Sequence, residues 1–128
     1  MEKEIKILLV DDEEDFRTLM SFWLKSKGYS VESVADGNTA LDKIRKNLPD
    51  VVFIDLHMPV LDGVEVLKEI RKWKVELPII VISAHADEVK LKEAKTYGIS
   101  GVFYKGKRFE EGLELIEFAL KAHKKLKK

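Results

Sequence analysis

Short apolar runs rich in Val and Ile alternate along the chain with segments of helical periodicity. The runs occupy residues 7–10, 51–54, 79–82 and 102–104. Near-continuous apolar strands of this length are typical of a parallel sheet that is covered by helices on both faces. The pattern therefore predicts an α/β protein in which a strand and a helix alternate five times.

The predicted strands cover residues 5–10, 29–34, 51–55, 78–82 and 101–105. Predicted helices cover residues 13–27, 86–97 and 109–126. Two further helices are capped by Asp36 and Asp62, and Pro49 ends the first of these two. The expected apolar stripes are Phe16, Leu19, Met20 and Trp23, then Ala40, Leu41, Ile44 and Leu48, then Val66, Leu67, Ile70 and Trp73. Right-handed crossovers between parallel strands favour a doubly wound, flavodoxin-like (βα)5 sheet with strand order 2-1-3-4-5.

Polar side chains stand at the ends of four of these runs. Asp11 and Asp12 follow the first strand, Asp55 closes the third, Ser83 closes the fourth, and Lys105 follows the fifth. Ligands of open α/β sheets bind in the crevice beyond the carboxyl ends of the strands. Three carboxylates, a hydroxyl and an ammonium in one crevice predict a site for a divalent metal and a phosphoryl group.

Converging carboxylates repel one another unless their pKa values rise or a cation neutralises them. Mg²⁺ suits such a site because it takes oxygen ligands, needs few protein carboxylates and keeps waters that a phosphate can replace. We expect Asp12 and Asp55 to bind it directly and Asp11 to act through water. The backbone carbonyl of His57 is expected to supply a further oxygen.

With a metal bound, Asp55 can act as a nucleophile and form an acyl phosphate. Lys105 would pair with the transferred phosphoryl group, and Ser83 would donate a hydrogen bond to it. Taken singly, each residue has a plainer interpretation, because Asp11, Asp12 and Ser83 could be helix caps and Lys105 a solvated lysine. Their joint order at the strand ends favours the phosphoryl site.

These residues closely resemble the receiver domain of two-component response regulators over essentially all of residues 1–128. The motifs that carry the resemblance are residues 7–13, ILLVDDE; residues 55–59, DLHMP; Asp62-Gly63; Ser83-Ala84; and Lys105. The resemblance implies a five-stranded receiver, Mg²⁺ dependence and Asp55 as phosphoacceptor. It also implies a sensor histidine kinase or histidine phosphotransfer protein as phosphodonor, and a switch rather than an enzyme with turnover.

Two positions depart from the family pattern. Receivers usually carry an aromatic residue three positions before the lysine, where this chain has Val102, and proline after it, where this chain has Gly106. The lysine–proline bond is commonly cis in the family, whereas a non-proline cis bond costs ~2.5–4 kcal/mol. We therefore expect a trans Lys105–Gly106 bond, a loop that turns at the glycine, and a lysine that still reaches Asp55. Transmission of the signal is expected to follow a route other than the usual aromatic rotation.

Composition supports one cytoplasmic domain spanning residues 1–128. Its charges balance at 23 acidic and 23 basic residues, it has no cysteine, and no apolar run approaches the ~20 residues of a membrane helix. No direct nucleic-acid binding or signal peptide is expected, and residues 121–128, with five lysines, are expected to form a basic helix end or tail. The final helix carries a docking stripe of Phe109, Leu113, Ile116 and Leu120, beside a second stripe of Leu115, Phe118, Ala122 and Leu126. This second stripe suggests a contact with a second subunit or an effector domain.

Three other classes of site fit the sequence less well. A phosphatase or phosphotransferase with an aspartyl-phosphate intermediate typically needs a second acid where this chain has His57, and a cap domain beyond this length. A flavin or nucleotide module typically needs a glycine-rich phosphate loop after the first strand, whereas residues 11–14 of this chain are acidic. A zinc site could use His57 and His85 with the carboxylates, although both histidines are better placed to flank a phosphoryl group.

Overall fold

The computed structural model describes residues 4–73, 76–84 and 88–122 of the 128-residue chain. Five strands alternate with five helices along these residues. The strands are β1 (Lys6–Val10), β2 (Ser30–Val34), β3 (Val51–Asp55), β4 (Ile79–Ser83) and β5 (Gly101–Tyr104). The helices are α1 (Glu14–Ser26), α2 (Gly37–Lys46), α3 (Gly63–Lys72), α4 (Glu88–Thr96) and α5 (Phe109–Ala122).

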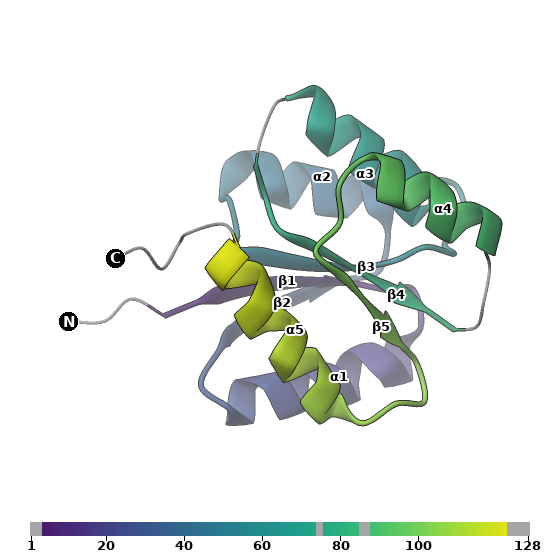
Figure 1. Ribbon diagram of the computed structural model, residues 1–128. Helices are drawn as coiled ribbons and strands as arrows, with labels where there is room; N and C mark the ends of the chain where they lie inside the picture. The colour runs from purple at the N-terminus through teal and green to yellow at the C-terminus, as the bar shows by residue number, and fades with distance from the viewer. Residues whose placement is uncertain (1–3, 74–75, 85–87, 123–128) are drawn as a thin grey trace.

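The strands form one parallel sheet in the order β2-β1-β3-β4-β5, which confirms the predicted fold and strand order. Helices α2, α3 and α4 lie on one face of the sheet, and α1 and α5 lie on the other (Figure 1). The chain reverses its direction of travel across the sheet between β2 and β3, so β1 has β2 on one side and β3 on the other. None of the described helices has the length and apolar character that a membrane crossing requires.

Side chains alternate between the two faces along each strand, so each face carries its own core. In β3, Val52 and Ile54 pack toward α2, α3 and α4, whereas Val51 and Phe53 pack toward α1 and α5. All four are fully buried. A strand covered on both sides in this way has no polar face, which is why its sequence forms a continuous apolar run.

The helix stripes were predicted largely correctly, with two errors. Leu19 was expected in the core but is 59% exposed, and Leu24, which was not named, is fully buried on α1. Leu48 was expected on the second helix, but α2 ends at Lys46 and Leu48 is 53% exposed in the following loop. Leu19 fits the helical spacing but lies outside the arc of α1 that packs against the sheet. Leu48 fits the spacing but lies beyond the last residue of α2.

The two predicted stripes of α5 have different outcomes. Ile116 and Leu120 of the docking stripe are buried against the sheet, as expected. Leu115 of the second stripe also packs on this core, over Gly101, so its assignment to an outer surface was wrong. Phe118 is 62% exposed, whereas Leu126 lies outside the described residues. Ala122 is exposed as well, so a subunit or effector contact through α5 stays a prediction that now rests on Phe118 and Ala122.

The β3–α3 loop contains a strained residue. Val60 has φ +68°, and among the described residues it is the one non-glycine residue with a positive φ. Its side chain is 91% exposed, so no packing compensates for the steric contact between Cβ and the backbone in this conformation. Two contacts hold this conformation. Leu61 N donates a hydrogen bond to the Pro59 carbonyl oxygen at 2.8 Å across Val60. After the loop, Asp62 caps α3 by accepting a hydrogen bond from the Glu65 backbone N–H.

We expect Val60→Asn to raise the free energy of unfolding by about 1 kcal/mol, because asparagine tolerates the left-handed region. Urea unfolding measures the change. The matched control is Val60→Thr, which keeps the branched Cβ and should leave stability unchanged. Equal effects of the two substitutions would show that backbone strain is not the cause.

Candidate functional site

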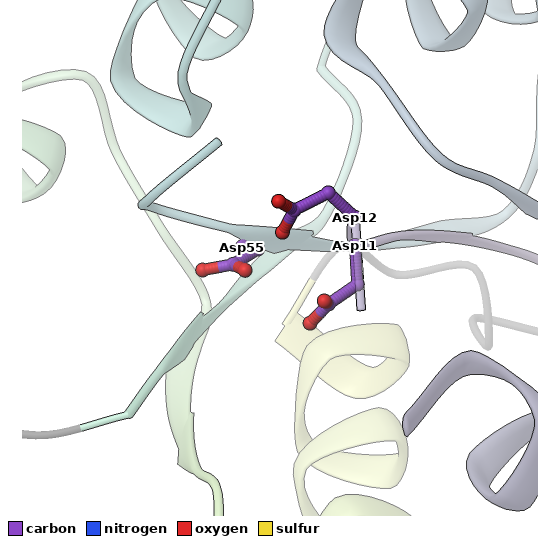
Figure 2. Close-up of side chains that lie close together, drawn as sticks. All are labelled: Asp11, Asp12 and Asp55. Carbon is purple, nitrogen blue, oxygen red and sulfur yellow. The ribbon is translucent and has the colours of Figure 1, made fainter. Parts of the chain in front are cut away.

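Asp11, Asp12 and Asp55 converge at the carboxyl edge of the sheet (Figure 2). Asp11 and Asp12 follow β1, Asp55 is the last residue of β3, and these strands are neighbours with Val10 opposite Ile54. One carboxylate oxygen from each of the three aspartates lies within 4.8 Å of the others. Asp11 is fully buried and Asp55 is 5% exposed, whereas Asp12 is exposed. The three carboxylates therefore form one cluster that opens to solvent on the side of Asp12.

Lys105 reaches this cluster from the loop after β5. Its Nζ lies 3.0 Å from Asp11 Oδ2 and 3.7 Å from Asp55 Oδ2. The structure contains no cis peptide bond among its described residues, so the Lys105–Gly106 bond is trans, as predicted. Gly106 has φ +93° and turns the loop as expected of glycine. The lysine thus reaches Asp55 without the usual proline.

Backbone amides orient both buried carboxylates. Asp11 Oδ1 accepts a hydrogen bond from Glu13 N at 2.8 Å, and Asp55 Oδ1 accepts one from His57 N at 2.9 Å. The N-cap position of α1 is Glu13, so neither Asp11 nor Asp12 is the cap of this helix. At His57 the contact is made by the N–H, and metal binding by its carbonyl oxygen stays a prediction.

Gly63 lies directly against the backbone of Asp55. A Cβ atom at this position would collide with the backbone carbonyl oxygen of Asp55 and approach Cα of Leu56 to 2.9 Å. Only glycine lets α3 begin this close to the end of β3. The Asp62-Gly63 pair therefore both caps α3 and fixes the course of the chain just after Asp55.

Ser83 occupies the corresponding end of β4. It is fully buried and lies opposite Tyr104 in the sheet, and its carbonyl oxygen accepts a hydrogen bond from Lys105 N at 2.9 Å. Helix α4 begins five positions later, at Glu88, so Ser83 does not cap it. His85 lies outside the described residues. Ser83 and Lys105 thus belong to the same rim of the sheet as Asp55.

Burial dominates the electrostatics of the cluster. Desolvation raises the pKa of Asp55 to about 6, against the hydrogen bond from His57, and it also raises the pKa of Asp11. For Lys105, desolvation alone would lower the pKa, but hydrogen bonds to Glu13 and Asp11 and the charges of Asp11 and Asp55 outweigh it and raise the pKa. The site therefore holds a charged ammonium beside two carboxyl groups, Asp11 and Asp55, that bind a proton more readily than ordinary aspartates.

The cluster has the donor set of a hard divalent cation. All three of its members offer carboxylate oxygens, which Mg²⁺ and Ca²⁺ prefer. Asp11 Oδ2 is buried and has no hydrogen-bond donor among the described residues, although it pairs electrostatically with Lys105. An oxygen with unused acceptor capacity beside an exposed carboxylate fits a hydrated metal ion.

Two neighbours of Lys105 were not predicted as site residues. Glu13 Oε1 lies 2.7 Å from Nζ, and Nζ lies 4.8 Å from the centre of the Phe16 ring. The uninterrupted acidic segment at residues 11–14 was a signal for Glu13, but nothing in the sequence pairs it with a lysine 92 positions away. Phe16 was assigned to the core stripe of α1, and it does pack there as well.

Comparison with known proteins assigns the family. Residues 7–117 match the model of the response regulator receiver domain, so the chain belongs to this family. The transcriptional regulatory protein PhoP of alkaline phosphatase synthesis in Bacillus subtilis is 42% identical over 83 residues, which are 65% of this chain and 35% of PhoP. The chain thus spans about a third of the length of this curated relative.

Solved receivers have the same fold. The chemotaxis protein CheY4 of Vibrio cholerae is 33% identical, with a TM-score of 0.86 over 92% of this chain and 100% of that chain. A CheY-like receiver domain protein of Methanospirillum hungatei is 24% identical, with a TM-score of 0.90 over 96% of this chain and 98% of that one; this second likeness concerns the fold alone.

A receiver domain is a phosphorylation-regulated signalling switch of two-component systems, and the function predicted from the sequence is confirmed at this level. Its acidic cluster is consistent with the divalent metal site typical of receivers. Membership also implies a histidine kinase as the general class of partner.

The raised pKa of Asp55 predicts how stability depends on pH without metal. The folded state binds a proton at Asp55 up to about pH 6 but the unfolded state only to about 3.8, so the free energy of unfolding should fall as pH rises from 4 to 7. The shift corresponds to a loss of up to about 3 kcal/mol. Asp55→Asn should remove the part of this slope that Asp55 contributes and leave the part from Asp11, whose pKa is also raised, as measured by urea unfolding in EDTA.

The control for this experiment is Asp36→Asn. The hydrogen bond from Thr39 N to Asp36 lowers the pKa of this carboxyl, so its contribution to stability is complete above pH 3.8 and is lost only below it. The pH 4 to 7 slope of the wild type should persist in this variant. A slope unchanged in Asp55→Asn would contradict the electrostatic picture of the cluster.

Proposed function

We propose that Asp55 is the phosphoacceptor of this receiver and takes a phosphoryl group from a phosphohistidine of a sensor histidine kinase or histidine phosphotransfer protein. The observation that carries the proposal is the position of Asp55 between the acidic pair and Lys105, whose Nζ lies 3.7 Å from Asp55 Oδ2. The hydrogen bond from His57 N fixes the rotation of the carboxylate. One oxygen is therefore held by the backbone and the other faces the ammonium.

The proposed reaction is a direct phosphoryl transfer. An oxygen of ionised Asp55 attacks phosphorus, the P–N bond to the donor histidine breaks, and its electron pair stays on the imidazole. The product is an acyl phosphate on Asp55. Lys105 pairs with the added phosphoryl oxygens, and Ser83 donates its hydroxyl to them. With a pKa of about 6, Asp55 is mostly ionised at neutral pH and thus competent as a nucleophile.

Mg²⁺ is the proposed cation of the cluster. Asp12 and Asp55 would bind it directly, Asp11 would bind through water, and the carbonyl of His57 would add an oxygen. When bound, the cation supplies charge neutralisation for the incoming phosphoryl group. The exposed position of Asp12 supports its role as a direct ligand, because its carboxylate can face a partly hydrated ion.

The proposed output route runs through the α1–α5 layer. Val102, at the usual aromatic position, packs on the opposite face of the sheet, toward α2, α3 and α4. Lys105 instead lies on the ring of Phe16, whose ring lies 6.2 Å from that of Phe103 and 6.3 Å from that of Phe109. A movement of Lys105 toward a phosphoryl group would change this aromatic packing at the start of α5.

Acetyl phosphate with Mg²⁺ should label Asp55 alone. Mass spectrometry after borohydride reduction identifies the acyl phosphate site, and EDTA should abolish the label. Asp55→Asn should lose it, whereas Asp42→Asn, on the exposed surface of α2 and paired with Lys46, should keep it. Full labelling of the Asp55 variant would disprove the assignment of the phosphoacceptor.

The two aspartates after β1 should differ in their effect on the cation. Asp12→Ala should weaken Mg²⁺ binding more than Asp11→Ala, because a direct ligand is lost rather than one acting through water. Isothermal titration calorimetry of each variant measures the affinity, with unfolding curves to verify that both are folded. A larger loss in Asp11→Ala would exchange the two proposed roles.

A further inference from the structure

Glu13 is the nearest carboxylate to the Lys105 ammonium. Its Oε1 lies 2.7 Å from Nζ, compared with 3.0 Å for Asp11 Oδ2 and 3.7 Å for Asp55 Oδ2. Although Glu13 stands at the N-cap position of α1, its side chain makes no capping hydrogen bond. It reaches instead across the site to the β5–α5 loop. The nearest carboxylate partner of Lys105 among the described residues is therefore outside the aspartate cluster.

The partners of Lys105 differ in how easily they can be exchanged. Asp11 is fully buried and is held by the hydrogen bond from Glu13 N, so it cannot leave the ammonium without a change in the β1–α1 loop. The Glu13 side chain is 58% exposed and can rotate into water at little cost. Hydrogen bonds to Glu13 and Asp11 use two of the three N–H donors of the ammonium and hold Nζ 3.7 Å from Asp55 Oδ2. A phosphoryl group on Asp55 would attract the ammonium toward itself and so away from Glu13.

We infer that Glu13 is a positioning residue that retains Lys105 on the α1 side of the site while Asp55 is unmodified, and that it must release the lysine when a phosphoryl group arrives. This inference rests on the proposed role of Asp55. The Glu13–Lys105 pair favours the unphosphorylated state, because in the phosphorylated state the glutamate and the phosphoryl group attract the same ammonium to different positions. Removal of the Glu13 charge should then favour the phosphorylated state.

Beryllium fluoride with Mg²⁺ provides a direct test, because it mimics a phosphoryl group on an aspartate without turnover. Glu13→Gln should bind it about threefold or more tightly than the wild type, the size expected for the loss of a half-exposed ion pair. ¹⁹F NMR of the bound fluoride measures the affinity. The matched control is Glu14→Gln, which removes the same charge one residue further on, where no contact with Lys105 occurs in the described structure.

Two outcomes would overturn the inference. If Glu13→Gln increases the affinity for beryllium fluoride no more than Glu14→Gln does, the gain comes from the removal of negative charge in general and not from the contact with Lys105. An effect that persists in a Lys105→Met background would show that it acts through α1 rather than through the lysine, since a coupled pair loses its interaction when either partner is removed. If the wild type itself binds no beryllium fluoride, the proposed role of Asp55 fails as well, and that result is distinguishable from failure of Glu13 alone.

Discussion

The burial of two carboxylates at the end of a parallel sheet is the constraint on which this structure depends. Asp11 and Asp55 are almost inaccessible to solvent, and desolvation raises the pKa of both. An uncompensated buried charge is strongly unfavourable, so the fold must supply a counter-charge and backbone donors at this point. Lys105 supplies the charge, and the amides of Glu13 and His57 supply the donors.

The strand order explains why the counter-charge arrives from so far along the chain. Asp11 and Asp55 belong to adjacent strands, but β5 is separated from β3 by β4. Lys105 must therefore extend across the end of β4, where its amide is anchored by the carbonyl of Ser83. The positive φ of Gly106 then turns the chain toward α5. The loop after β5 thus connects the chemistry of the site to the position of one helix.

Most of this arrangement could be predicted because parallel strands end at a common edge. The positions of Asp11, Asp55 and Lys105 followed from apolar runs alone, and the trans bond followed from the absence of proline. The exposure of Leu19 and the partial burial of Leu115 could not be predicted, because helical spacing defines the apolar arc of a helix but not how deeply that arc packs against the sheet. The contact of Glu13 with Lys105 was equally hidden, since long polar side chains choose partners only after the backbone is in place.

The charges around Lys105 explain why its contact with Glu13 can change on phosphorylation. Three carboxylates, those of Asp11, Glu13 and Asp55, lie within 3.7 Å of the Lys105 ammonium, and Asp12 belongs to the same aspartate cluster. Of these four residues, Asp12 and Glu13 are exposed to solvent. A divalent cation on the aspartate cluster would reduce the repulsion, whereas a phosphoryl group would add negative charge close to Lys105. Asp12 is engaged by the cation in this scheme, and Asp11 is enclosed. Glu13 is then the carboxylate from which Lys105 can separate most easily. A change of partner by Lys105, from Glu13 to a phosphoryl group, can therefore couple the charge on Asp55 to the α1–α5 layer.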